Sequence, residues 1–309
     1  MIDQIIKKLK GIFYSTHFSS YLLDVNGKDI SDITNMIITK KIETASFNFL
    51  NLPTTIADAF VYANNDTIWI FYELQEHLDS KGLIMSIHSE DGIVWSSPEL
   101  ILEESVHLSF PFVFFSNNTT YMLPETSFMN EIRLYKGSNN CRNFKFFKTI
   151  LKGERYVDSV IHKKDDYWYL FTSIQNKDNS YIFKIFFSTD LEGEWNEHPK
   201  SPISSGKYCE RNAGPIINYN GILLRPAQNN TLHYATNTHL YKISTLSPTE
   251  YSEEPYALNI LPCGFLRNVG GHQLSYVKFK EKEYVAIDVL QTSINLNAII
   301  KRIKYILSK

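Results

Sequence analysis

The sequence predicts an all-β protein, a five-bladed β-propeller with a short amphipathic helix at each terminus. One segment with the form of a β-hairpin recurs five times along the chain. Aromatic residues make up 14% of the chain, with 19 Tyr and 20 Phe, and this bias suits pleated sheets. A β-sandwich of irregular Greek keys is the alternative, but a sandwich has no reason to repeat the same hairpin at a regular interval.

Each copy of the repeat begins with a small or acidic motif and continues through an apolar strand, a polar turn and a second apolar strand that ends on a polar residue. Successive copies begin roughly 45 to 60 residues apart, which is the size of a propeller blade. The five copies span residues 57–73, 109–125, 157–173, 212–228 and 270–288. Further strands are expected at 82–89, 94–103, 131–137, 144–153 and 180–190 and around Trp195. These would complete blades of four strands.

The two ends of the chain differ from the repeats. We expect a helix and lead-in strands in residues 1–50, the propeller in 51–293 and a second helix in 294–309. Isoleucines recur at helical spacing at both ends, with lysines between them. Such basic amphipathic helices can pack on the propeller and cap its open edges. The other interpretation is peripheral docking on the anionic, cytoplasmic face of a membrane.

Charge and cysteine usage exclude several classes of function. The formal net charge of −2 provides no basic field for nucleic acid. The three cysteines are far apart, which suggests neither a metal site nor a disulfide framework and fits a reducing compartment. Lysines interrupt the N-terminal apolar residues, so no secretory signal is expected, and no apolar run reaches the length of a membrane span. We therefore expect a cytoplasmic protein.

The repeat itself predicts a site. The first strand of every propeller blade lines the central channel, so equivalent repeat positions converge at one mouth of the axis. The converging positions in the first strands are Asp58, Pro111, Asp158, Gly214 with Pro215, and His272. Near the ends of the second strands lie Glu125, Arg225 and Gln228.

Asp58, Glu125 and Asp158 are the candidate catalytic residues. A carboxylate at the start of a strand commonly caps a turn, but three carboxylates that face one funnel favour a function. Glycosyl transfer and glycoside hydrolysis need such groups. One carboxylate attacks the anomeric carbon, stabilises a cationic sugar transition state or activates an acceptor hydroxyl, and another with a raised pKa protonates the leaving group.

Five motifs together resemble one known family. They are Ala-Asp-Ala-Phe at 57–60, His-Leu-Ser-Phe-Pro-Phe at 107–112, Tyr-Met-Leu-Pro-Glu-Thr-Ser at 121–127, Val-Asp-Ser-Val at 157–160 and Arg-Pro-Ala-Gln at 225–228. The family is the N-terminal propeller domain of glucosamine inositolphosphorylceramide transferase and its free-standing bacterial relatives. It is similar in turn to five-bladed glycosidases and transferases that include arabinanases and levansucrases. The resemblance covers roughly residues 50 to 290.

The resemblance implies roles for single residues. Asp58 matches an aspartate that acts as nucleophile or base, and Asp158 matches one that positions substrate and tunes the acid. Glu125 matches the Pro-Glu motif of the family and is the best candidate for an acid or an electrostatic group. His272 resembles an axial histidine that helps to hold a central ion in some relatives. The chain departs from the pattern in two places. Asp58 is followed by Ala where the wider group has Pro, and residues 211–215 lack a hydrolytic glutamate, although Glu210 lies just upstream. The second departure argues against simple hydrolysis.

These observations favour a membrane-associated glycosyltransferase for cell-surface polysaccharide or glycolipid. Its partners would be an activated, phosphate-linked sugar donor and a glycan or glycolipid acceptor. A phosphate leaving group needs cations or hydrogen-bond donors rather than a strong acid. The candidate substrate-binding residues are His107, Arg211, Asn212, Arg225, Gln228 and His272. No cofactor or catalytic metal is expected, and a structural ion near His272 stays open. The alternatives are a hydrolase or phosphorylase of glycans and a non-catalytic carbohydrate-binding propeller.

Overall fold

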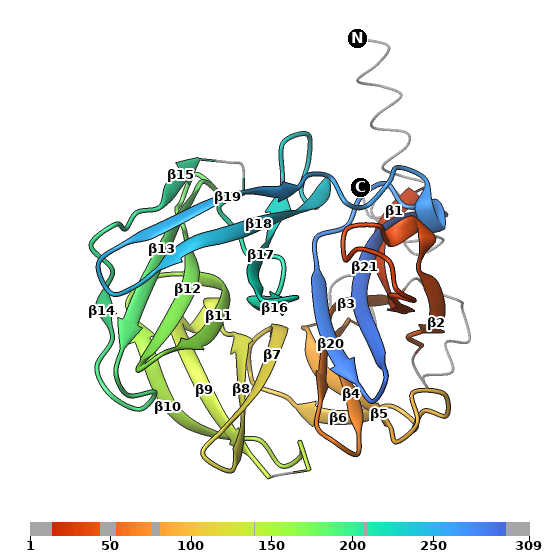
Figure 1. Ribbon diagram of the computed structural model, residues 1–309, viewed down its shortest axis with the longest axis horizontal. Coiled ribbons are helices and arrows are strands. Elements are labelled where there is room, and N and C mark those ends of the chain that lie inside the picture. The colour runs from red at the N-terminus through yellow and green to blue at the C-terminus, as the bar shows by residue number, and fades with distance from the viewer. Residues whose placement is uncertain (1–13, 44–53, 76–80, 139, 207–208, 295–309) are drawn as a thin grey trace, which may run out of the picture.

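The computed structural model is an all-β, five-bladed propeller, as the repeat predicted. It describes residues 14–43, 54–75, 81–138, 140–206 and 209–294. Five antiparallel sheets surround a central axis in chain order (Figure 1). Within the described ranges, helical geometry is limited to three short 3-10 turns, η1 (Ile33–Asn35), η2 (Ser127–Met129) and η3 (Phe265–Arg267). The amphipathic helices expected at the termini lie outside the described residues.

Blades one to four are runs of consecutive antiparallel strands. Blade one holds β3 (Thr55–Ala63), β4 (Ile68–Gln75), β5 (Leu83–Ser89) and β6 (Glu99–Leu102). Blade two holds β7 (Ser109–Ser116), β8 (Thr119–Glu125), β9 (Glu131–Gly137) and β10 (Lys145–Lys152). Blade three holds β11 (Tyr156–Lys164), β12 (Tyr167–Gln175), β13 (Tyr181–Ser188) and β14 (Asn196–Glu197), and β15 (Ser204–Gly206) also pairs with β13. Blade four holds β16 (Ile217–Tyr219), β17 (Ile222–Asn229), β18 (Asn237–Leu246) and β19 (Tyr251–Ala257).

Blade five joins both ends of the described chain. Its inner strands are β20 (Leu274–Phe279) and β21 (Lys282–Ile294), and its outer strands are β1 (Tyr14–Asp24) and β2 (Ile37–Lys41). β1 pairs with β21 along its whole length, from Tyr14 opposite Ile294 to Asp24 opposite Tyr284. The lead-in strands expected before residue 51 are therefore the outer half of this blade. Their pairing closes the ring with backbone hydrogen bonds, which protects strand edges that would otherwise be exposed.

The core lies between the blades rather than within one layer. Each blade packs both faces against its neighbours, so a central strand such as β4 is buried at seven of its eight positions. Buried apolar clusters fill the gaps between neighbouring blades. Because both faces are buried, the strands read as continuous apolar runs rather than as an alternation of apolar and polar residues.

A β-bulge interrupts the first strand of blades one, two and three at the same repeat position. The register shifts between Ala57 and Phe60, and at the corresponding places in β7 and β11. The bulged residues Asp58, Phe110 and Asp158 have φ of 51°, 49° and 51°. Non-glycine residues adopt this left-handed conformation rarely, and such positions cluster at functional sites. Phe110, and not Pro111 as the repeat alignment suggested, is thus the blade-two equivalent of Asp58.

Candidate active site

Seven charged or titratable side chains meet at one mouth of the propeller axis, and we call this group the axial centre. Its members are Asp58, Glu73, Glu125, Asp158, Arg211, His272 and Asp288. Asp58 and Asp158 come from the bulges, whereas Glu73, Glu125 and Asp288 occupy second strands, β4, β8 and β21. The pairs Ala57–Glu73 and Ser109–Glu125 lie opposite each other in register. The propeller symmetry therefore gathers carboxylates that are far apart in sequence.

Backbone N–H groups of the bulges bind these carboxylates across the blade boundaries. The N–H of Asp58 donates to Asp288 Oδ2 at 3.2 Å, that of Phe110 to Asp58 Oδ2 at 3.0 Å and that of Asp158 to Glu125 Oε2 at 3.1 Å. Each bond joins a bulge to a carboxylate of the preceding blade. The left-handed bulge conformation thus orients both the amide and the side chain toward the axis.

Asp58 is buried in the middle of the axial centre. Only 6% of the residue is exposed. Burial raises its pKa to about 7, and the negative charges of Asp288, Asp158 and Glu125 add to this effect, while His272 opposes it. The pKa of Asp58 therefore lies where the side chain can accept or release a proton near neutral pH, as general acid–base chemistry requires.

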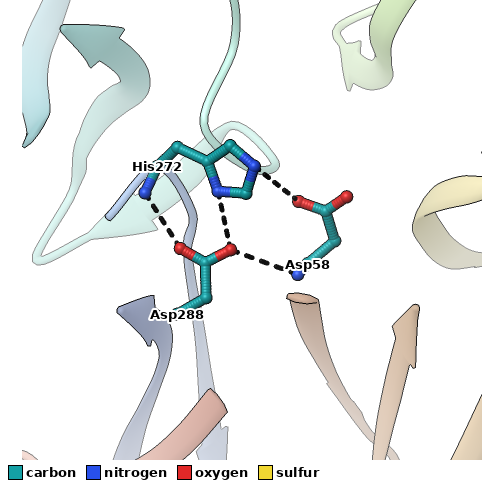
Figure 2. Close-up of side chains that lie close together, drawn as sticks. All are labelled: Asp58, His272 and Asp288. Carbon is teal, nitrogen blue, oxygen red and sulfur yellow. Dashed lines mark hydrogen bonds and ion pairs between the residues drawn. The ribbon is translucent and has the colours of Figure 1, made fainter. Parts of the chain in front are cut away.

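His272 lies between Asp58 and Asp288 (Figure 2). Its Nδ1 is 2.6 Å from Asp288 Oδ2, and its Nε2 is 3.8 Å from Asp58 Oδ1. The ring of Phe18 stacks on the imidazole with centroids 4.4 Å apart. Burial by itself lowers the pKa of His272, but Asp288 and Asp58 outweigh it, so the pKa lies above 6.5. The imidazolium form is favoured between these two carboxylates.

A central cation at this position does not fit the residues present. Asp58, His272 and Asp288 each offer a ligand atom, and the three atoms lie within 4.8 Å of one another. However, Asp288 Oδ1 already accepts the N–H groups of His272 and Gln273, at 2.9 and 3.1 Å, and Oδ2 accepts the N–H of Asp58. A metal bound to this fully buried carboxylate would lie among N–H donors that repel it. The imidazolium of His272 already supplies a positive charge between the two aspartates.

Arg211 and Asp158 form a bidentate ion pair beside Glu125. Arg211 Nη2 is 2.9 Å from Asp158 Oδ1, and Nε is 2.5 Å from Oδ2. The guanidinium also lies over the rings of Tyr181 and Tyr234, 5.1 and 5.4 Å from their centroids. Burial raises the pKa of Glu125, as does the charge of Asp158, whereas Arg211 lowers it. Arg211 is thus a fixed cation that faces the carboxylates.

His107, from the connection between β6 and β7, lies beside Glu73 of the axial centre. The N–H of Gly82 donates to His107 Nδ1 at 2.8 Å, so the other ring nitrogen, Nε2, carries the proton and faces Glu73 Oε1 at 3.3 Å. Burial lowers the pKa of His107 and keeps the ring neutral. Burial raises the pKa of Glu73 well above 4.5, as do Asp58, Glu125 and Asp288. Burial and these charges therefore favour the protonated form of Glu73.

The structure brings together six of the nine residues selected from the sequence: Asp58, His107, Glu125, Asp158, Arg211 and His272. Sequence reasoning did not select Glu73 and Asp288, although two repeat copies end on them, at the position that Glu125 occupies in blade two. It also missed Tyr234, which packs its edge on His272 with centroids 5.2 Å apart and is 49% exposed. Tyr234 belongs to the connection between β17 and β18, where no repeat position marks it.

Arg225, Asn212 and Gln228, which were predicted to bind substrate, are buried and bonded to other parts of the protein. Arg225 is 1% exposed and donates two bonds of 2.7 Å to Glu253 of β19. It points between blades three and four, over the ring of Phe183, because its place in β17 turns the side chain into the blade interface. An arginine at the end of an apolar strand does not reach the axis here.

Asn212 and Gln228 are buried in the same region. Asn212 donates to the backbone oxygens of Asp158 and Phe171, at 2.8 and 3.2 Å, and thereby ties blade four to blade three. Gln228 donates to the backbone oxygen of Asn212 at 2.9 Å. Their exposed fractions are 0% and 1%, and their amide groups are taken up by these backbone contacts. Asn212 acts instead on the backbone that positions Asp158.

The fold and the axial centre define a five-bladed propeller with clustered carboxylates on its axis. Solved propellers share this fold. An exo-β-1,3-galactanase from Clostridium thermocellum matches with a TM-score of 0.57 and 14% identity, over 72% of this chain and 53% of the galactanase. A family 117 glycoside hydrolase from Zobellia galactanivorans matches with a TM-score of 0.55 and 10% identity, over 93% of this chain and 92% of the hydrolase.

The chain belongs to the family described as "Glucosamine inositolphosphorylceramide transferase 1, N-terminal", whose profile matches residues 26–288. Glucosamine inositolphosphorylceramide transferase 1 of Arabidopsis thaliana is 34% identical over 228 residues, 72% of this chain and 29% of the relative. The protein of the same name in Oryza sativa subsp. japonica is 33% identical over 211 residues, 66% of this chain and 28% of the relative. The chain thus spans less than a third of the length of these transferases. Among the described residues, no helix is both long and apolar enough to cross a membrane.

Proposed function

We propose that the protein is a glycosyltransferase that moves a sugar from a phosphate-linked donor to a hydroxyl of a glycan or glycolipid acceptor. The observation that carries the proposal is the axial centre, in which a carboxylate with a pKa of about 7, Asp58, lies among further carboxylates and beside a fixed arginine. The relationship to proteins named as glucosamine inositolphosphorylceramide transferases supports transfer to a glycolipid.

In the proposed reaction, the anomeric carbon of the donor lies over the carboxylates. Their negative charge stabilises the cationic character of the sugar in the transition state. The acceptor oxygen forms a bond to the anomeric carbon, and its proton passes to Asp58. The bond from this carbon to the phosphate oxygen breaks, and the phosphate leaves with the electron pair. Arg211 is the cation that we assign to the developing charge on the phosphate.

The raised pKa of Glu73 favours glycoside hydrolysis as a second candidate. Burial and neighbouring carboxylates raise its pKa, so it retains the proton that a glycosidase acid donates to a leaving group. Glu73 of blade one would then take the role of the hydrolytic glutamate that blade four lacks. Phosphate and diphosphate leaving groups need no such acid, and this difference separates the two candidates experimentally.

The test is a turnover screen of the purified protein with nucleotide sugars, phosphoribosyl diphosphate and simple glycosides. We expect donor-dependent product that Asp58→Asn abolishes. Thr249→Ala, an exposed change on blade four, is the control. If sugar is released from glycosides and no activated donor reacts, the transferase proposal is rejected in favour of the hydrolase. Glycan binding without turnover in either assay would reject both and indicate a recognition module.

A further inference from the structure

A second concave site lies beside the axial centre, between the loops of blades four and five. It encloses about 690 Å³, within the range of roughly 300–1,000 Å³ that is typical of small-molecule sites. One wall is the connection between β17 and β18, and the other is the chain that leads from β19 to β20. Both walls belong to residues 209–294, which the structure describes without a gap. We call this cavity the side hollow.

A second cavity links the side hollow to two aromatic residues that contact the axial centre. A neighbouring cavity of about 570 Å³ shares His233 and Val269 with it and reaches Phe18 and Tyr234. Phe18 and Tyr234 both pack against His272 of the axial centre. The side hollow is therefore separated from His272 of the axial centre by the neighbouring cavity and these two aromatic rings.

The walls of the side hollow carry amides, hydroxyls and apolar groups. Four asparagines and two threonines lie among its described lining residues, and none of these lining residues is Asp, Glu, Lys or Arg. The apolar wall comes from Leu232, Leu261 and Val269. This composition contrasts with the charged axial centre, because it offers hydrogen bonds to neutral hydroxyls and apolar contact to C–H faces, but its described lining has no lysine or arginine to balance a phosphate and only His233 as a titratable base.

Internal hydrogen bonds hold these walls in place before any ligand binds. Asn229 donates to Asn259 Oδ1 at 2.9 Å, and Asn237 bonds to both backbone groups of Leu261, at 2.8 and 3.0 Å. Asn268 differs from these residues. Its Oδ1 accepts the N–H of Gly264 at 3.0 Å, but its Nδ2 has no hydrogen-bond partner, although only 5% of the residue is exposed. A buried donor without an acceptor indicates a missing partner at this wall.

We propose that the side hollow binds an uncharged sugar residue of the acceptor, while the charged donor occupies the axial centre. This assignment rests on the proposed transfer reaction. The division follows the charges. A phosphate gains from the permanent charge of Arg211, whereas the described walls of the side hollow carry neither lysine nor arginine. Asn268 would donate to a sugar oxygen, and Leu232 and Val269 would contact the apolar face of the ring.

The first test is binding to an array of neutral and acidic glycans, followed by the two variants Leu232→Asp and Asn268→Asp. Leu232 is 81% exposed, and the Asn268 change is isosteric and keeps the oxygen that accepts from Gly264. We expect binding of a neutral glycan that each variant weakens at least tenfold. Leu258→Asp is the matched control, because Leu258 is exposed on the same blade and does not line the hollow. Melting curves check that the variants are folded.

The second test uses Cys263, an exposed thiol that lines the side hollow. We expect the bound glycan to slow alkylation of Cys263 by iodoacetamide, measured by mass spectrometry, in the wild type and equally in Asp58→Asn. No glycan binding on the array, binding of acidic glycans alone, or full binding by Leu232→Asp would overturn the assignment. If glycan protects Cys263 but no donor is ever turned over, the proposed reaction fails and the sugar site stands.

Discussion

The buried ion pair of Arg225 and Glu253 makes a sharp prediction, because it decides between a structural and a substrate-binding role for Arg225. The side chains are 2% and 14% exposed and share two bonds of 2.7 Å. In Glu253→Gln, the guanidinium stays buried with weaker acceptors, the backbone oxygen of Cys209 at 3.3 Å and Asn212 Oδ1 at 3.4 Å. Breaking one side of such a pair costs about 3–5 kcal/mol, and we expect the lower end because glutamine keeps one acceptor oxygen.

The assay is urea unfolding of Glu253→Gln and of the double variant Arg225→Met with Glu253→Leu. The double variant removes both charges, so its free energy of unfolding should lie closer to that of the wild type than the single variant does. Burial by itself raises the pKa of Glu253, but Arg225 outweighs it and holds the pKa below 4.5. The pair therefore stabilises the fold above pH 4.5, and this contribution is lost as the pH falls through the lower folded pKa. A loss below about 1 kcal/mol for Glu253→Gln, or a folded double variant without activity, would refute the structural role.

Two further predictions concern the axis and the blade junctions. Asp58 has a pKa raised from 3.8 to about 7, so the folded state keeps a proton that the unfolded chain releases, and the wild type loses stability as the pH rises through this interval. Asp58→Asn should therefore have a higher melting temperature than the wild type at pH 8, and the difference in melting temperature should be smaller at pH 5. An equal difference in melting temperature at both pH values would contradict the raised pKa. Gly214 has φ of +153°, and a Cβ there would lie 1.9 Å from the backbone oxygen of Leu274. Gly214→Ala should therefore lower the free energy of unfolding, measured with urea, by more than about 3 kcal/mol. Gly221→Ala is the control, because Gly221 also has positive φ but has open space around its Cβ position. We expect it to lower the free energy of unfolding by about 1 kcal/mol. Similar losses for both variants would show that backbone strain, and not the clash with Leu274, causes the loss at Gly214.

The five blades could be predicted because a repeat imposes the same local pattern on every copy. All five expected hairpins are found in blades one to five, with turns of polar residues between apolar runs. The closure of blade five by β1 was harder to predict, since pairing over such a sequence separation leaves no local signal. Strand composition shows that a strand forms, but not which partner it finds.

The axial centre could be predicted only in part. Repeat alignment selects residues by their place along a strand, and it identified Asp58, Glu125 and Asp158 because propeller symmetry brings equal places together. It failed for Arg225, because the direction of a side chain in a blade depends on the pleat and on the neighbouring blade. It also shifted the blade-two position by one residue, since a bulge adds a residue without a signature in the sequence.

The sequence by itself determined the class of fold, the number of blades and the family of this protein, because these depend on periodicity and on ordered motifs. Only the tertiary structure decided which carboxylate has a pKa near neutral, since the pKa of Asp58 depends on burial and on the charges of His272, Asp288, Asp158 and Glu125. It also decided that Arg225 joins two blades and that a neutral hollow adjoins the charged axis. Electrostatic and packing energies depend on distances between residues that are remote in the chain, and only the folded ring sets those distances.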